Sequence, residues 1–188
     1  ASALLDMGLV HYQIETIHPF ADGNGRVGRM LISLMAVKSD LLHMPALYLS
    51  PVIERDKNRY IDALYAVSAS GDWVGWLKYF FDTVAKSCRE TVEVIDRLLD
   101  LQSSYRQMAS SSIKSANVLS IVDMLFESPV VTPRKIVERL SITDVAARNL
   151  LSKLCDLGIL YEYTAIYPKA YIALGISDAV NRREQEVT

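Results

Sequence analysis

A stretch of twelve residues, HPFADGNGRVGR at positions 18–29, collects side chains whose types and spacing could do phosphate chemistry. Helical spacing on both sides places the backbone amides of residues 23–25 at the start of a helix. Unpaired N–H groups and the positive end of the helix dipole bind anions at such a point. Arg26 and Arg29 are three residues apart, so both guanidinium groups can reach one side of the same turn. The stretch therefore predicts a polyphosphate site.

Two more side chains would make this site a reaction centre. Asp22 supplies one carboxylate, and Mg²⁺ prefers one or two protein oxygens together with phosphate oxygens and water. His18 could take a proton from an attacking hydroxyl, because imidazole exchanges protons near neutral pH. A base, a metal ligand and a cationic phosphate cradle together indicate phosphoryl or nucleotidyl transfer.

Two other interpretations of the glycines exist. Residues 23–28 formally satisfy G-x-G-x-x-G, with Asp40 about where a ribose-binding acid should lie. A dinucleotide site needs a preceding β-strand, whereas the residues before His18 end a helix. An ordinary helix-turn-helix corner explains the glycines, with Phe20 plugging the core. That corner leaves five functional side chains unexplained: His18, Asp22, Asn24, Arg26 and Arg29.

The elements that must position these residues are helical. Apolar residues in 4–17 recur at three- and four-residue steps, and His18-Pro19 should end this helix. A second helix is expected from about Asn24, and helical spacing returns through Tyr60 and from Trp73 to Leu101. The expected buried faces comprise Leu5, Leu9, Val10, Ile14 and Ile17 in the first helix and Val27, Met30, Leu31, Leu34, Met35 and Val37 in the second.

The second half of the chain reads as a separate small domain. Residues 102–115 are serine-rich and poor in large apolar residues, which indicates a linker. Three helical patterns follow: one around Val118–Phe126, one capped by Thr132-Pro133, and one ending near Gly158. Residues 159–163 and 170–174, joined across Pro168-Lys169, predict a hairpin, so residues 116–176 predict a winged helix-turn-helix domain. A polar tail is expected over 177–188.

Composition limits the functional classes. The net charge of -2 creates no overall field that would recruit nucleic acid or anionic membranes. Two cysteines, Cys88 and Cys155, are too few for a disulfide framework and favour a cytoplasmic setting, and no apolar run approaches a membrane span. The first residues run straight into a helical pattern without a methionine, which suggests that the natural start lies upstream.

The stretch resembles the signature of the Fic family, H-P-F-x-[D/E]-G-N-G-R-x-x-R, at every fixed position. Residues 11–17, 58–64 and 71–81 are also similar to Fic segments, so the resemblance covers about residues 4–100. It implies a mainly α fold in which residues 1–101 form the carboxy-terminal part of a Fic-type helical core. It also implies a protein adenylyltransferase that moves AMP from ATP to a Tyr, Thr or Ser hydroxyl of a target protein and releases pyrophosphate.

The resemblance assigns roles by position. His18 is the general base, Asp22 holds Mg²⁺, Asn24 and the amides of 23–25 stabilise the α-phosphate, and Arg26 and Arg29 bind the outer phosphates. Glycine rather than lysine at position 25 separates the chain from the phosphotransferase branch. The expected nucleotide-binding residues are Gly23, Asn24, Gly25, Arg26, Val27, Gly28, Arg29 and Tyr60, although a core position explains Tyr60 equally well.

Two family features are missing from this sequence. Only seventeen residues precede His18, so the β-hairpin flap that holds the target peptide and the first core helices are absent. No glutamate lies in the context of the family's inhibitory helix, [S/T]-x-x-x-E-[G/N]. We expect a fragment of a longer protein that transfers AMP poorly alone.

The second domain offers a function of another class. Its third helix resembles the recognition helix of winged-helix regulators, and Arg148, Asn149 and Lys153 would be its candidate DNA-reading residues. Residues 113–175 carry seven basic and six acidic side chains, a poor electrostatic footprint for DNA. Docking to a protein or self-association is therefore favoured, with a DNA-binding regulator as the alternative.

Overall fold

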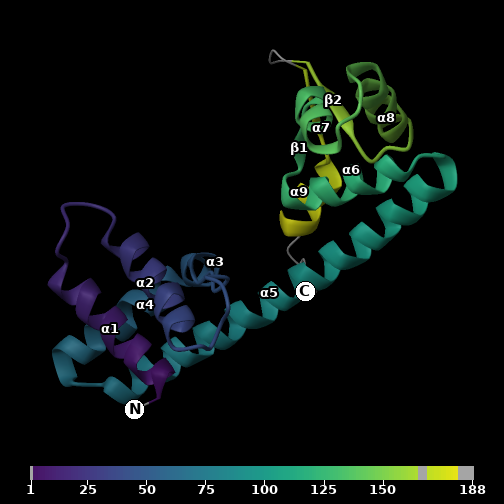
Figure 1. The fold of residues 1–188 in the computed structure, drawn as a ribbon. Coiled ribbons are helices and arrows are strands. Elements are labelled where there is room, and N and C mark those ends of the chain that lie inside the picture. Colours follow the sequence, from purple (N-terminus) through teal and green to yellow (C-terminus); the bar gives the residue numbers. More distant parts are fainter. Residues whose placement is uncertain (1, 165–168, 182–188) are drawn as a thin grey trace. The chain divides into compact units, whose positions relative to one another are not determined.

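The computed structural model describes residues 2–164 and 169–181. It is mainly helical, with one small antiparallel sheet of three strands, as the sequence predicts (Figure 1). The chain divides into two compact units, Ala1–Glu93 and Val94–Thr188. Helix α5, Trp73–Ser112, passes from the first unit into the second.

The first unit contains α1 (Ala3–Ile17), α2 (Asn24–Lys38), α3 (Ser50–Arg55), α4 (Lys57–Ser70) and the start of α5. Its core is rich in aromatic rings around Trp76, whose Nε1 donates to the carbonyl oxygen of Gly8 at 3.0 Å. Gly8 is needed there because a Cβ would lie 3.0 Å from Leu77 and 3.1 Å from Phe80. Helix α1 therefore lies directly against α5.

The buried faces of α1 and α2 differ from the predicted ones. On α1 the buried residues are Met7, Gly8, His11 and Tyr12, whereas Ile17 is 62% exposed. On α2 they are Asn24, Gly28, Ile32, Ser33 and Ala36, whereas Met30 is 59% and Leu34 49% exposed. Small and hydrogen-bonded polar residues occupy these faces: the Ser33 hydroxyl donates to the Leu47 carbonyl, and Gly28 lets α1 approach. A periodicity based on large apolar residues cannot identify such a face.

The second unit contains α6 (Ala116–Glu127), β1 (Val130–Val131), α7 (Pro133–Leu140), α8 (Asp144–Asp156), β2 (Tyr161–Tyr163), β3 (Ala170–Ile172) and α9 (Leu174–Asn181). The strand order is β1-β3-β2, all antiparallel, with Tyr161 opposite Ile172 and Tyr163 opposite Ala170. The three helices and the hairpin strands occur in the predicted order. The two-residue strand β1 was not predicted, and Pro168 of the expected turn lies outside the described residues.

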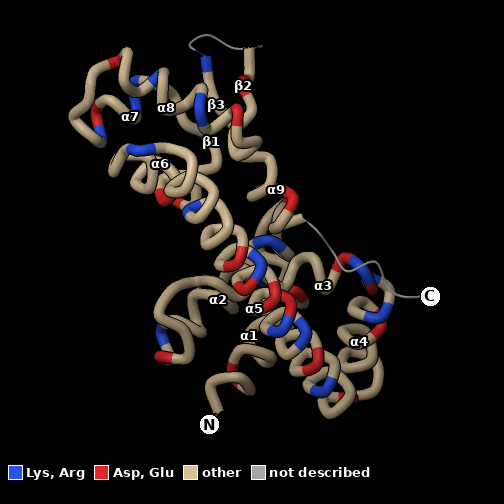
Figure 2. Tube along the Cα trace, turned by 90° about the vertical axis from the view of Figure 1, so that its right-hand side faces the viewer, with Lys and Arg blue, Asp and Glu red and all other residues tan. Residues whose placement is uncertain are grey.

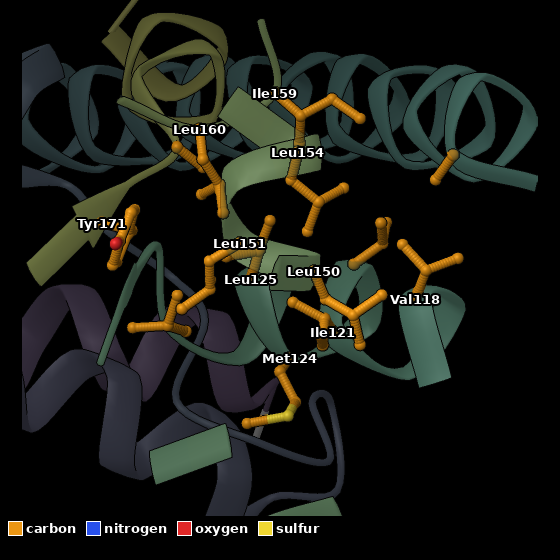
Figure 3. Close-up of a cluster of buried hydrophobic side chains, with 14 of the residues drawn as sticks. Val118, Ile121, Met124, Leu125, Leu150, Leu151, Leu154, Ile159, Leu160 and Tyr171 are labelled. Carbon is orange, nitrogen blue, oxygen red and sulfur yellow. The ribbon is translucent and has the colours of Figure 1, made fainter. Parts of the chain in front are cut away.

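Side chains of α6 and α8 fill the core of this unit. Figure 3 shows Ile121 and Leu125 pointing toward Leu150, Leu151 and Leu154. The predicted caps are present: Thr132 accepts from the Lys135 amide at 3.3 Å, and Thr143 accepts from the Ala146 amide at 3.2 Å. These caps fix the residues at which α7 and α8 begin, and hence the turn between the two helices.

Two predicted boundaries need correction. Residues 102–112, expected as a linker, continue α5, and Tyr105, Ala109 and Ile113 are buried in the second core. Their four-residue spacing places them on one helix face, while the intervening serines that suggested a linker are exposed. The polar tail was expected from 177, but α9 continues to Asn181 with Ile176 buried; residues 182–188 lie outside the described part.

The contact at Gly28 gives a test of the first unit. A Cβ on Gly28 would stand 2.8 Å from Glu15 Oε1 and 3.0 Å from Nδ1 of the buried His11 ring. We expect Gly28→Ala to lower the free energy of unfolding by about 1–2 kcal/mol despite the better helix propensity of alanine. Met30→Ala, at an exposed position of the same helix, should change it by less than about 0.5 kcal/mol.

Both tryptophans, Trp73 and Trp76, lie in the first unit, so urea unfolding followed by tryptophan fluorescence measures this unit alone. Equal stability of the Gly28→Ala and Met30→Ala variants would contradict the proposed tight contact.

Candidate functional site

The loop between α1 and α2 begins at His18, which adopts the left-handed conformation (φ 53°, ψ 56°) and bonds its amide to the Ile14 carbonyl at 2.9 Å. The His18 Nδ1 lies 3.3 Å from the carbonyl oxygen of Glu15. A carbonyl oxygen can only accept a hydrogen bond, so Nδ1 is the nitrogen that carries the proton. In the neutral imidazole Nε2 then has the free lone pair. His18 is exposed, so this nitrogen can act as a base on a bound molecule.

Asn24 holds the loop closed. Its side-chain Oδ1 accepts from the Phe20 amide at 2.9 Å, and its Nδ2 donates to the Phe20 carbonyl at 2.6 Å. The side chain is buried, whereas Phe20 is half exposed and does not plug the core. In this arrangement Asn24 acts on the loop itself, and a role at the α-phosphate remains a prediction.

Helix α2 begins with its amides directed at the loop. Gly23 precedes the helix with φ 83°, a conformation that other residues rarely adopt, and the first intrahelical bond joins the Val27 amide to the Gly23 carbonyl at 3.0 Å. The amides of residues 24–26 therefore have no acceptor within the helix. Together with the helix dipole these amides have the polarity that an anion site requires, whereas the Gly23 amide, also predicted to take part, donates to Asp22 Oδ1; anion binding here stays a prediction.

Two arginines reach back over this helix end. The position of a Cβ on Gly23 lies 3.3 Å from Arg26 Nη2, and that of a Cβ on Gly25 lies 3.0 Å from Arg29 Nη1. Arg29 Nε also donates to Ser50 Oγ at 2.9 Å. Side chains of a helix point toward its N-terminus, which is why residues one turn inside α2 serve its first turn. The structure thus brings both guanidinium groups to the predicted site.

Asp22 lies at the open side of the loop with 94% of its side chain exposed. Its Oδ1 accepts from the Gly23 amide at 2.6 Å, and its Oδ2 is 3.4 Å from Arg26 Nη2. Within the described part of the chain there is no cluster of three or more histidine, cysteine or carboxylate side chains that could hold a metal alone. A single exposed carboxylate beside a phosphate site fits Mg²⁺ that arrives with a nucleotide, since phosphate oxygens supply further ligands.

A buried polar cluster that the sequence analysis missed lies under the loop. His11 Nε2 and the Tyr60 hydroxyl are hydrogen-bonded at 3.0 Å, and His11 Nε2 is 4.0 Å from Glu15 Oε1. Tyr60 is buried against Trp76 and Tyr79, so it occupies a core position rather than an exposed pocket wall. Gly28, predicted to bind nucleotide, faces this cluster instead. The four-residue spacing of His11 and Glu15 places both on one face of α1, and this spacing is the sequence feature that could have predicted the cluster.

Burial controls the protonation of this cluster. Burial, and then the charge of Arg29, lower the pKa of His11 from 6.5 to about 4. Burial raises the pKa of Glu15, and the charge of Arg29 opposes that shift in part. Burial and the Glu15 carboxylate raise the pKa of Tyr60. His11 and Tyr60 are therefore neutral near pH 7.

The candidate DNA-reading residues of the second unit, Arg148, Asn149 and Lys153, are exposed on α8. Arg148 Nε donates to Asp144 Oδ2 at 2.6 Å. Ion pairs of the same kind join Arg134 to Glu138, Arg139 to Glu127 and Lys169 to Glu162. Basic and acidic residues accordingly alternate over this unit in Figure 2. Cations already paired with acids contribute less to binding phosphates, which weakens the electrostatic case for DNA.

The lowered pKa of His11 predicts a pH-dependent stability. Below pH 6.5 the unfolded chain takes up a proton at this histidine, whereas the native protein does not until about pH 4. The free energy of unfolding of the first unit should therefore fall by up to about 3 kcal/mol as pH drops through this window. Urea unfolding followed by tryptophan fluorescence at a series of pH values measures this.

His11→Gln should remove most of that slope, and His43→Gln, which changes an exposed histidine, should keep it. The assignment fails if the wild-type protein and the His11→Gln variant lose stability in parallel.

No helix in residues 2–164 or 169–181 combines the length and the apolar composition that crossing a membrane requires.

Comparison with known proteins places the loop in a family. Residues 1–36, which comprise α1, the loop and most of α2, match the sequence model of the Fic/DOC family. A protein of Aquifex aeolicus (strain VF5) named "Probable protein adenylyltransferase aq_aa38" is 43% identical over 56 residues, which are 30% of this chain and 15% of that protein. The chain therefore aligns with only a small part of that relative. The similarity to the Fic/DOC family is therefore established for residues 1–36, which contain α1, the loop and most of α2.

Proposed function

We propose that this chain carries the nucleotide-transfer site of a protein adenylyltransferase, which moves AMP from ATP to a Tyr, Thr or Ser hydroxyl of a target protein. The observation that carries the proposal is the placement of Asp22, Arg26 and Arg29 at the amide end of α2, on a loop that begins at the exposed His18. The name of the Aquifex relative and the match to the Fic/DOC family support the same class of reaction.

Each group has a chemical task in the proposed step. The target hydroxyl oxygen attacks the α-phosphorus of ATP while its proton passes to Nε2 of His18, the nitrogen left without a proton by the contact of Nδ1 with the Glu15 carbonyl. The bond between the α-phosphorus and the bridging oxygen to the β-phosphate breaks, and pyrophosphate leaves. The α2 amides, Arg26 and Arg29 bind the phosphate oxygens, on which negative charge develops. Asp22 would hold Mg²⁺, which when bound neutralises part of the phosphate charge.

The surroundings of Gly25 favour nucleotidyl transfer over phosphoryl transfer. A Cβ there would lie 3.0 Å from Arg29 Nη1, so a longer side chain would displace the guanidinium group. Glycine at this position thus leaves room for the guanidinium group of Arg29 over the start of α2. This agrees with the resemblance, in which the phosphotransferase branch has lysine.

For the second unit we propose docking to a protein, which includes self-association, rather than reading of DNA. The ion pairs of Arg134, Arg139, Arg148 and Lys169 support this choice, because they neutralise local positive charge.

A labelling comparison tests the proposed reaction. The chain is incubated with Mg²⁺, a lysate as a source of targets, and ATP labelled on either the α- or the γ-phosphate. We expect protein-bound label only from the α-phosphate. His18→Ala should lower the labelling rate roughly 10²- to 10⁴-fold, because the general base is lost. His43→Ala, which removes an exposed histidine outside the loop, is the matched control.

Retention of γ-label above the level of the lysate alone would show a kinase and overturn the proposal, as would α-labelling by the wild-type protein that does not exceed the level of the lysate alone. Equal α-labelling by wild type and the His18→Ala variant would refute the assignment of the base.

A further inference from the structure

Ser50 anchors the Arg29 side chain over the first turn of α2. The Nε of Arg29 donates to Ser50 Oγ at 2.9 Å, and its Nη1 lies 3.0 Å from where a Cβ on Gly25 would be. The hydroxyl of Ser50 occupies one of the five guanidinium donors and leaves the others available. A side chain this long has many rotamers, so a second contact is needed to keep its end over the first turn of α2.

The Glu15 carboxylate lies next to the same point. Glu15 Oε1 is 3.7 Å from the position of a Cβ on Gly25 and 2.8 Å from that of a Cβ on Gly28. Glu15 Oε1 therefore lies beside the face of α2 that carries Gly25 and Gly28. The side chain is only 12% exposed, and the Tyr60 hydroxyl is a hydrogen-bond partner of its carboxyl group, but no donor in the described part of the chain hydrogen-bonds its buried Oε1. A buried carboxylate oxygen without a hydrogen bond is costly unless a nearby cation compensates it.

The surrounding groups leave Arg29 as the main compensating cation. Buried His11, 4.0 Å away, is neutral near pH 7 because burial lowers its pKa. Tyr60 is neutral as well. Among the charges that act on Glu15, Arg29 has the largest effect, followed by His18. Glu15 and Arg29 form no ion pair within 4.0 Å, but both lie near Gly25, and their opposite charges act on each other across α1 and α2.

We propose that Glu15 is a positioning residue for Arg29: its carboxylate, enclosed between α1 and Gly28, keeps the guanidinium group over the first turn of α2, ready for the nucleotide phosphates. This inference rests on the proposed function for its catalytic consequence. Glu15 does not compete with the phosphates, because it approaches Arg29 from the buried side while the loop opens to solvent at Asp22. The planar guanidinium group can serve Ser50, Glu15 and a phosphate together.

The test uses Glu15→Gln, which removes the charge and keeps the shape, in a cycle with Arg29→Ala. We expect Glu15→Gln to raise the KM for MgATP roughly ten- to a hundredfold with little change in kcat, because a displaced cation weakens phosphate binding. Combined with Arg29→Ala, the same change should have no further effect on KM, since Glu15 acts only through Arg29. Gln13→Ala, an exposed change on the same helix, is the control and should leave KM unchanged.

An unchanged KM in the Glu15→Gln variant would overturn the proposal. A lowered KM would overturn it too, since Glu15 would then oppose nucleotide binding. Equal fold-changes with and without Arg29 would show a general structural effect instead.

A second measurement needs no nucleotide and separates this inference from the proposed function. If Glu15 and Arg29 are coupled, the urea midpoints of the two single variants and the double variant are non-additive, and tryptophan fluorescence reports them. Non-additive midpoints in a protein that transfers no AMP would support the coupling and refute the proposed reaction. Additive midpoints would refute the coupling whatever the activity.

Discussion

Helices α1 and α2 meet at Gly28, where a methyl group would stand 2.8 Å from the carboxylate of Glu15 and 3.0 Å from the ring of His11. This close approach encloses a carboxylate and an imidazole between two helices and a layer of aromatic rings. It also determines how far the start of α2 lies from the end of α1, and hence where the loop that joins them can run. The exposed loop with Arg26 and the buried cluster of His11, Glu15 and Tyr60 both depend on this one contact between α1 and α2.

Hydrogen bonds fix the backbone of the loop at both of its ends. His18 turns the chain out of α1 in the left-handed conformation, and the Asn24 side chain pairs with both backbone polar groups of Phe20. These contacts place a protonated Nδ1 against a carbonyl and free amides at the start of α2 without help from distant residues. A local motif can therefore carry the chemistry, while α1 and α5 supply a rigid base through the bond between Trp76 and Gly8.

The two units differ in where their basic side chains lie. In the first, Arg26, which is 3.4 Å from Asp22, and Arg29 lie at the amide end of a helix, where the helix dipole adds positive potential. In the second, basic side chains of α7, α8 and the sheet pair with acids of the same unit. A surface neutralised in this way discriminates by shape and apolar contact more than by attraction for phosphate. This difference supports a division in which the first unit binds the nucleotide and the second unit meets a protein.

The sequence by itself determined most of the helices, the caps at Thr132 and Thr143 and the hairpin strands, because these features depend on neighbours within a few positions; it did not predict α3 or α9. It misassigned the buried faces of α1 and α2, where glycine, serine and histidine take places that a search for large apolar residues overlooks. It also took the serine-rich end of α5 for a linker, although Tyr105 and Ala109 enter a core there. Only the tertiary structure placed Tyr60 in the core and brought the Glu15 carboxylate next to Gly25 and Gly28 of α2. Those contacts depend on which helices pack together, and this follows from close approach in space rather than from spacing along the chain.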